Sequence, residues 1–185
     1  MFTTDYADGR ADQTSSKSLQ NQQLPGFPHG GQDHRHQRVE WRRKVDNLMA
    51  GQGLLATAKT GTVSSRGQMI NDMPMHMIPS LEIGEAGYES RVALRAQHII
   101  KNQANKMQRC RIWLDDLTKI YSLLYACVVE ADMTLAGELL SNCDMSERPP
   151  IVGGQCLVGS MDGHQAYQIV MNSLFECERT EADKL

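Results

Sequence analysis

The chain has 185 residues, of which 41% are hydrophobic, and its formal net charge is −3 at pH 7. This length suffices for one domain of ordinary size and a tail. The longest apolar run, residues 121–129 interrupted only by Ser122, falls far short of the roughly 20 residues that span a bilayer. We therefore expect no membrane span and no membrane partner.

The cysteine usage points to a reducing compartment. The five cysteines are an odd number and contain no C-x-x-C pair, which disfavours both a disulfide framework and a compact zinc site. The first ten residues have neither the basic nor the apolar segment of a secretory signal. We expect an intracellular protein, cytoplasmic or nuclear, with reduced thiols.

The charges are segregated along the chain. Residues 1–33 carry a net charge of −2, residues 34–114 have 13 basic and 6 acidic side chains, and residues 115–185 have 4 basic and 12 acidic ones. Such a division predicts one positive and one negative face. The two faces could pair with each other within or between chains, or the positive face could bind a polyanion.

In chain order, the first expected unit is a disordered tail over residues 1–36, because this stretch is polar and has few large apolar side chains. A single helical domain is expected over residues 37–180. Its first element is a short amphipathic helix near residues 38–49, ended by glycines. The outer face of this helix is basic, and Trp41 beside it is interpreted either as a core anchor or as a platform for a base. The basic residues are Arg38, Arg42, Arg43 and Lys44.

Residues 51–87 are expected to form an irregular connector that is rich in glycine, methionine and proline, because Pro74 and Pro79 block a regular helix. Short strands are possible within it near residues 68–70 or 75–78. The segment from Gly53 to Thr60 imitates a phosphate-binding loop, but Ala58 replaces its second glycine and no strand is expected before it.

The next 49 residues, 88–136, contain neither glycine nor proline and predict a long helix. In their first half, polar residues recur at steps of three and four and form one stripe, with apolar residues on the opposite side. We expect the polar stripe to face outward and the apolar side to pack inward. The stripe consists of Arg91, Arg95, His98, Asn102, Asn105 and Arg109, and Lys101 lies near it.

The second half of this segment has a broader apolar face and is expected to be buried among other helices. A single helix of this length would be longer than the diameter of a small domain. The charges of Arg109 and Asp115 would also suit the end of one helix and the start of another. On the other hand, the apolar spacing runs through residues 107–121 without interruption. The length and the charges favour two helices with a bend within residues 102–115.

Beyond residue 141 the sequence predicts a stiff linker at residues 148–150, then a short strand or extended segment over residues 151–158. A final helix is expected over residues 162–178. Asp162 should cap it, with Gln165 placed for a capping box. The fold class is therefore mainly α, a small helical bundle with a long or bent central helix.

No residue pattern is strong enough to predict an enzyme, a metal or a cofactor. The methionines near His76 resemble a soft-metal ligand set, yet methionine more commonly fills irregular apolar gaps. His164 lies near a helix start without an evident nucleophile. Cys110, Cys127 and Cys177 are expected to be core residues, and Cys143 or Cys156 to be exposed.

The basic stripe carries the functional hypothesis. Arginine and lysine on a helix face supply phosphate contacts, and asparagine adds hydrogen bonds. We expect a non-enzymatic, self-assembling helical protein that binds the RNA or DNA backbone, an organisation typical of small viral structural proteins and nucleoproteins. The alternative is a protein-protein adaptor or assembly subunit, whose basic face pairs with acidic segments of a partner. The candidate nucleic-acid-binding residues of the first interpretation are Arg38, Arg42, Arg43, Lys44, Arg91, Arg95, Lys101, Asn105 and Arg109.

Overall fold

The structure is a computed structural model that describes residues 23–28, 35–74, 77, 84, 86–148 and 159–182, with side chains up to residue 176. Within these ranges the chain is mainly α-helical, as predicted, and its β-type pairing is limited to one isolated bridge between Asp144 and Met161. The helices are α1 (Arg35–Gly51), α2 (Leu55–Thr60), α3 (Ser65–Gln68), α4 (Tyr88–Val128), α5 (Met133–Asn142) and α6 (Gly163–Ala182).

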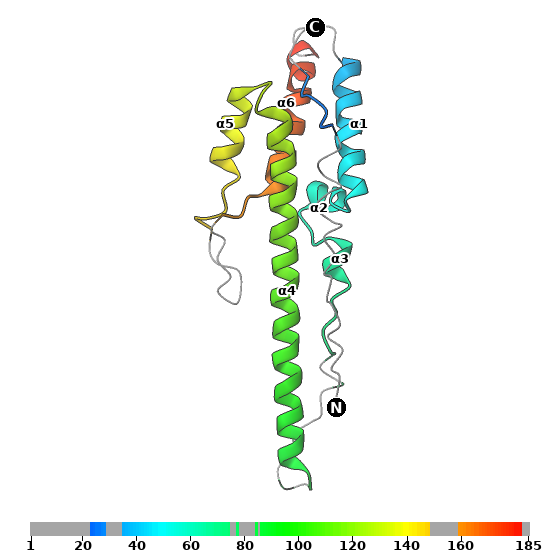
Figure 1. Cartoon of the computed structure of the whole chain (residues 1–185), viewed down its shortest axis with the longest axis vertical. Coiled ribbons are helices and arrows are strands. Elements are labelled where there is room, and N and C mark those ends of the chain that lie inside the picture. The colour runs from blue at the N-terminus through cyan, green and yellow to red at the C-terminus, as the bar shows by residue number, and fades with distance from the viewer. Residues whose placement is uncertain are drawn as a thin grey trace, which may run out of the picture.

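Helix α4 is the axis of the molecule. Its 41 residues correspond to about 62 Å at 1.5 Å per residue. Figure 1 shows it running along the molecule, with α1, α5 and α6 gathered around its C-terminal half and the N-terminal half extending away from them. The bend predicted within residues 102–115 is wrong, because the helix continues through this range.

The helix ends at Val128, within the stretch of residues 88–136 that contains neither glycine nor proline. Residues 129–132 form a turn, and Asp132 starts α5: its backbone is extended and its side chain accepts a hydrogen bond from the Leu135 N–H at 2.9 Å. A side-chain cap of this kind satisfies one of the unpaired N–H groups of a helix start.

The core lies between α1, α2, α5, α6 and the C-terminal half of α4. Its most completely buried side chains include Val45 and Met49 of α1, Leu124 of α4, Leu139 of α5 and Val170 of α6. Complete burial of one such side chain contributes about 1.5–3 kcal/mol. The prediction that the second half of the long helix is buried among other helices is confirmed.

The start of α6 packs directly on α4. A side chain at Gly163 would overlap the carbonyl oxygen of Leu117 and lie 2.6 Å from Cβ of Ile120, so only glycine permits this approach. The predicted cap is present, since Oδ1 of Asp162 accepts from the Gln165 N–H at 3.0 Å. The helix predicted over residues 162–178 is confirmed, and residues 151–158 lie outside the described part of the chain.

Part of the predicted tail belongs to the core. Phe27 is 9% exposed and meets Trp41 edge to face, with ring centroids 5.2 Å apart. Nε1 of Trp41 donates to the carbonyl of Pro25 at 2.9 Å, and the Phe27 N–H donates to that of Cys127 at 3.3 Å. Trp41 is therefore a core anchor, 3% exposed. The tail prediction is wrong for residues 23–28 and for residues 35–36, which begin α1. Residues 1–22 and 29–34 lie outside the described ranges.

The connector is less irregular than predicted. It contains the short helices α2 and α3, so the strand expected near residues 68–70 is wrong; of residues 75–78 only Met77 is described. Gly61 ends α2 with a left-handed φ of 70°, a conformation that glycine adopts without strain. The chain then runs from α3 beside α4, and this contact determines the environment of the polar stripe.

Candidate functional site

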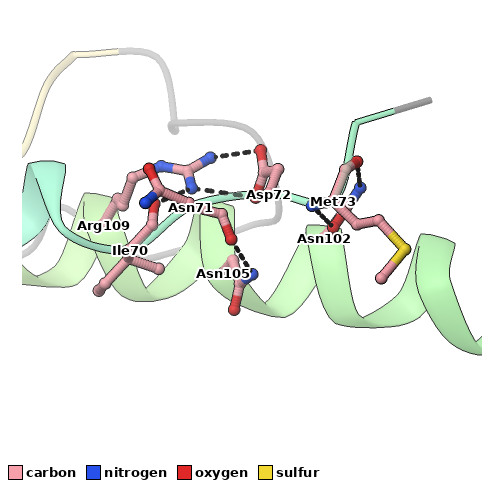
Figure 2. Close-up of polar contacts among 7 residues, drawn as sticks. All are labelled: Ile70, Asn71, Asp72, Met73, Asn102, Asn105 and Arg109. Carbon is pink, nitrogen blue, oxygen red and sulfur yellow. Dashed lines mark hydrogen bonds and ion pairs between the residues drawn. The ribbon is translucent and has the colours of Figure 1, made fainter. Parts of the chain in front are cut away.

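Part of the polar stripe of α4 holds the chain segment that follows α3 (Figure 2). Oδ1 of Asn102 accepts from the Met73 N–H at 2.8 Å, and Nδ2 of Asn102 donates to the Met73 carbonyl at 2.9 Å. One turn further on, Nδ2 of Asn105 donates to the carbonyl of Asn71 at 3.0 Å. These side-chain amides therefore satisfy backbone N–H and C=O groups of the connector that have no neighbouring strand to pair with.

Arg109 completes this contact. Its Nη1 donates to the carbonyl of Ile70 at 2.8 Å, and its two Nη atoms donate to the two carboxylate oxygens of Asp72 at 3.0 and 2.8 Å. The hydrogen bond from Arg109 lowers the pKa of Asp72, so the carboxylate remains ionised at neutral pH. The guanidinium is only 24% exposed and is occupied by this bidentate pair.

The predicted orientation of the stripe is therefore wrong at Asn102, Asn105 and Arg109, because these residues face another part of the chain. Arg91 and Arg95 share their side of the helix and are half-buried. Any contact of Arg91, Arg95 or Lys101 with nucleic acid remains a prediction.

The same side of α4 holds the connector further along. Nε1 of Trp113 donates to the Gly61 carbonyl at 2.8 Å. Asp116, 3% exposed, accepts from Oγ of Ser64 at 2.7 Å and from Nη2 of Arg66 at 3.1 Å. Sequence reasoning missed this buried carboxylate. Its signal was the spacing, since Asp116 lies seven residues after Arg109 and continues the polar stripe.

The apolar side of the N-terminal half of α4, predicted to pack inward, faces outward instead. Val92 is 38% exposed, Ile99 40% and Ile100 66%. Large aliphatic side chains in water cost hydrophobic free energy, and a contiguous group of them commonly marks a binding surface. We call the exposed apolar residues on this side of α4 the exposed apolar face. They are Val92, Ala93, Ala96, Ile99, Ile100 and Ala104.

Several cations of α4 are accessible beside this face. Lys101, Lys106 and Arg111 are exposed, and none of them forms an ion pair with a residue in the described ranges. Lysine and arginine in this state can bind phosphate groups or carboxylates of a partner. These three residues belong to the predicted basic region of the long helix and are accessible for such contacts.

The basic residues of α1 form a separate group at the other end of the molecule (Figure 1). Lys44 pairs with Glu40 at 3.1 Å and lowers the pKa of that carboxyl group. Arg42 lies 4.0 Å from Asp46, and Arg43 is exposed; Arg38 is half-buried. The two predicted basic patches therefore do not form one continuous surface.

The remaining chemical candidates have structural roles. Nδ1 of His164 donates to the Ala58 carbonyl at 2.8 Å, and Nε2 lies 3.1 Å from the amide nitrogen of Gln168, from which it accepts. The segment resembling a phosphate-binding loop is a short helix whose Lys59 pairs with Asp46 at 3.1 Å. No group of histidine, cysteine and carboxylate side chains suited to a metal occurs among the described residues.

The thiols follow the prediction in part. Cys127 is buried, as expected, whereas Cys110 is only half-buried. Cys143 was expected to be exposed as one of two candidates, but it is completely buried. Burial raises the pKa of Cys143 to about 12 and that of Cys127 to about 11, so both are protonated at neutral pH. The other two cysteines lie where side chains are not described.

Comparison with protein-family models, with curated proteins and with solved structures finds no match to this chain. None of the helices in the described ranges carries an apolar stretch that would cross a bilayer.

Proposed function

We propose that this protein is a non-enzymatic helical assembly subunit that associates with copies of itself through the exposed apolar face of α4. The observation that carries the proposal is the exposure of Val92, Ile99 and Ile100 on a half-helix that extends away from the bundle. The described connector residues Ile70–Met73 lie on the polar side of this half-helix, opposite the exposed apolar face.

Burial of the exposed apolar face in a contact between two copies is favoured over its exposure to water. Removing an isoleucine side chain from water contributes about 1.5–3 kcal/mol to association. In an isologous contact the same side chain is buried in both copies, so this contribution occurs twice. Among the described helices, α1, α5 and α6 lie around the C-terminal half of α4 and not along this half-helix, so a partner would stabilise it. The exposed apolar face therefore favours self-association, whereas the sequence-based alternative relied on pairing of the basic face with acidic segments of a partner.

The test is the molar mass measured by multi-angle light scattering over a range of concentrations. The wild-type mass should rise from 20.7 kDa toward twice that value. Ile100→Glu should weaken association by at least about 100-fold, because two aliphatic side chains are lost. Leu140→Glu is the matched control: Leu140 is 52% exposed but lies on α5, and this variant should associate like the wild type.

Circular dichroism should show equal helicity in both variants, which separates lost association from lost folding. A wild-type protein that stays at 20.7 kDa at every concentration would contradict the proposal. So would an Ile100→Glu variant with unchanged association.

A second candidate function is binding of the RNA or DNA backbone. It is favoured by the exposure of Lys101, Lys106 and Arg111 within eleven residues of one helix. Phosphate neutralisation would make the affinity fall steeply with salt. Lys101→Gln combined with Lys106→Gln should weaken binding and reduce the salt slope by about 2.

The matched control for this candidate is Lys119→Gln, because Lys119 is already paired with Asp115 at 2.8 Å. Fluorescence anisotropy with a labelled oligonucleotide measures the affinity of the wild type, the double variant and the control. Absence of binding at low salt would exclude this candidate without affecting self-association.

A further inference from the structure

The residues of the α4 N-terminal half that lie opposite the polar stripe form a pattern that reads the same in both directions. They follow one another at steps of 4, 3, 4, 4, 3 and 4, so the pattern is symmetric about its central residue, Ile100. At 100° per residue they lie within an arc of about 80°. All of them are exposed except Met107, which is half-buried. The residues are Glu89, Ala93, Ala96, Ile100, Ala104, Met107 and Arg111.

We propose that the partner of this face is a second copy of the chain, bound antiparallel about a two-fold axis at Ile100. This inference rests on the proposed self-association and specifies its geometry. In this register Ile100 of one copy contacts Ile100 of the other. Likewise, Ala96 contacts Ala104 and Ala93 contacts Met107 of the other copy. The alanines permit close approach of the two helices, and Ile99 flanks the axis. An isologous interface requires such self-complementarity.

Charge complementarity determines the direction. Glu89 is the one acidic residue in the sequence between residues 86 and 114, and it lies at one end of the pattern, with Arg111 at the other. An antiparallel pair brings Glu89 of each copy to Arg111 of the other and forms two reciprocal ion pairs. A parallel pair would set Glu89 against Glu89 and Arg111 against Arg111, which is unfavourable.

The shape of the molecule agrees with this direction. The helices α1, α5 and α6 surround the C-terminal half of α4, so a parallel pair would bring two bundles side by side (Figure 1). In the antiparallel pair the bundles lie at opposite ends of a contact about 33 Å long. The described connector residues Asp72 and Met73 are bound to the opposite side of the helix, through Arg109 and Asn102.

Charge exchange tests the register. Glu89→Arg and Arg111→Glu, each alone, place like charges together at both ends of the antiparallel contact, and each should weaken dimerisation about tenfold. The double variant restores opposite charges and should dimerise like the wild type. Glu130→Arg, which alters an exposed acid of the turn after α4, is the control and should have no effect. Sedimentation velocity measures the dimer constant, and circular dichroism checks that each variant keeps its helicity.

The outcomes separate this inference from the proposed function. In a parallel dimer neither single change would alter the balance of like charges, so both variants would dimerise like the wild type. That result, or failure of the double variant to recover, would overturn the antiparallel register. If Ile100→Glu still abolished the dimer, self-association through α4 would stand. If Ile100→Glu had no effect, the proposed function itself would fail.

Discussion

Two buried tyrosines differ in how their hydroxyl groups are satisfied. Oη of Tyr167 donates to Oδ1 of Asp46 at 2.9 Å, which connects α6 to α1. Oη of Tyr121 is buried in the core and has no hydrogen-bond partner in the described part of the molecule. An unsatisfied buried hydroxyl costs free energy, whereas a bonded one contributes to stability.

We predict opposite effects when each hydroxyl is removed. Tyr121→Phe should leave the free energy of unfolding unchanged or raise it by up to about 1 kcal/mol, because only an unpaired group is lost. Tyr167→Phe should lower it by about 1–2 kcal/mol, because Asp46 loses a hydrogen-bond donor. Urea unfolding followed by circular dichroism measures both. A larger loss in Tyr121→Phe than in Tyr167→Phe would contradict the structural difference.

At the scale of elements, the boundary between α4 and α5 depends on one side chain. Asp132 is the cap of α5, and the preceding turn contains no glycine or proline. Periodicity therefore predicted the helices before and after this point but not the break between them. Asparagine, aspartate and serine also occur within helices, so a lone Asp132 gave a weak signal.

Asp132→Ala should destabilise the protein by about 1 kcal/mol and speed the exchange of the Leu135 amide, which loses its acceptor. Asp132→Asn keeps a side-chain oxygen for the same hydrogen bond, so its loss of stability should be much smaller. Hydrogen exchange resolved by NMR reports the local effect, and urea unfolding reports the global one. Equal stability of the alanine variant and the wild type would show that the turn does not need the cap.

The long central helix itself was predictable because its polar and apolar residues are sorted at helical spacing. The bend was predicted from the change of charge sign near Arg109 and Asp115. The structure has a continuous helix there, and contacts with the connector on one side hold it: Trp113 with Gly61 and Asp116 with Ser64. Charges near a helix terminus add a few tenths to about 1 kcal/mol, which is less than these contacts and the continuous apolar spacing supply.

At the scale of the whole molecule, the core should make the fold sensitive to alkali. Burial raises the pKa of Tyr121 and Tyr167 from 10.0 to about 12, and raises that of Cys127 to about 11 and Cys143 to about 12 from 9.0. Because the folded protein holds these protons more tightly than the unfolded chain, stability is complete below about pH 9 and declines as the pH rises toward 12.

The urea midpoint should therefore fall between pH 8 and pH 10.5, and the fall should be smaller in Tyr121→Phe, which lacks one of these groups. A midpoint that is constant over this interval would contradict the burial of the four groups.

The candidate site was predictable only in part. The sequence identified the stripe from Arg91 to Arg109 and the apolar side opposite it, but assigned the two sides the wrong way round. The error arose because a polar side chain is satisfied equally well by water or by backbone groups of the same chain. The connector that binds Asn102 and Arg109 is rich in glycine and proline and has little periodicity, so its path could not be deduced.

The sequence by itself determined that the chain is mainly helical, where α1 and α6 lie, and which residues share a side of α4. Local spacing suffices for this, because a helix repeats every 3.6 residues whatever surrounds it. The tertiary structure decided which side of α4 meets the rest of the chain and which is left open. That choice depends on contacts between residues far apart in sequence, such as Asp72 with Arg109, and these place Ile99 and Ile100 in solvent.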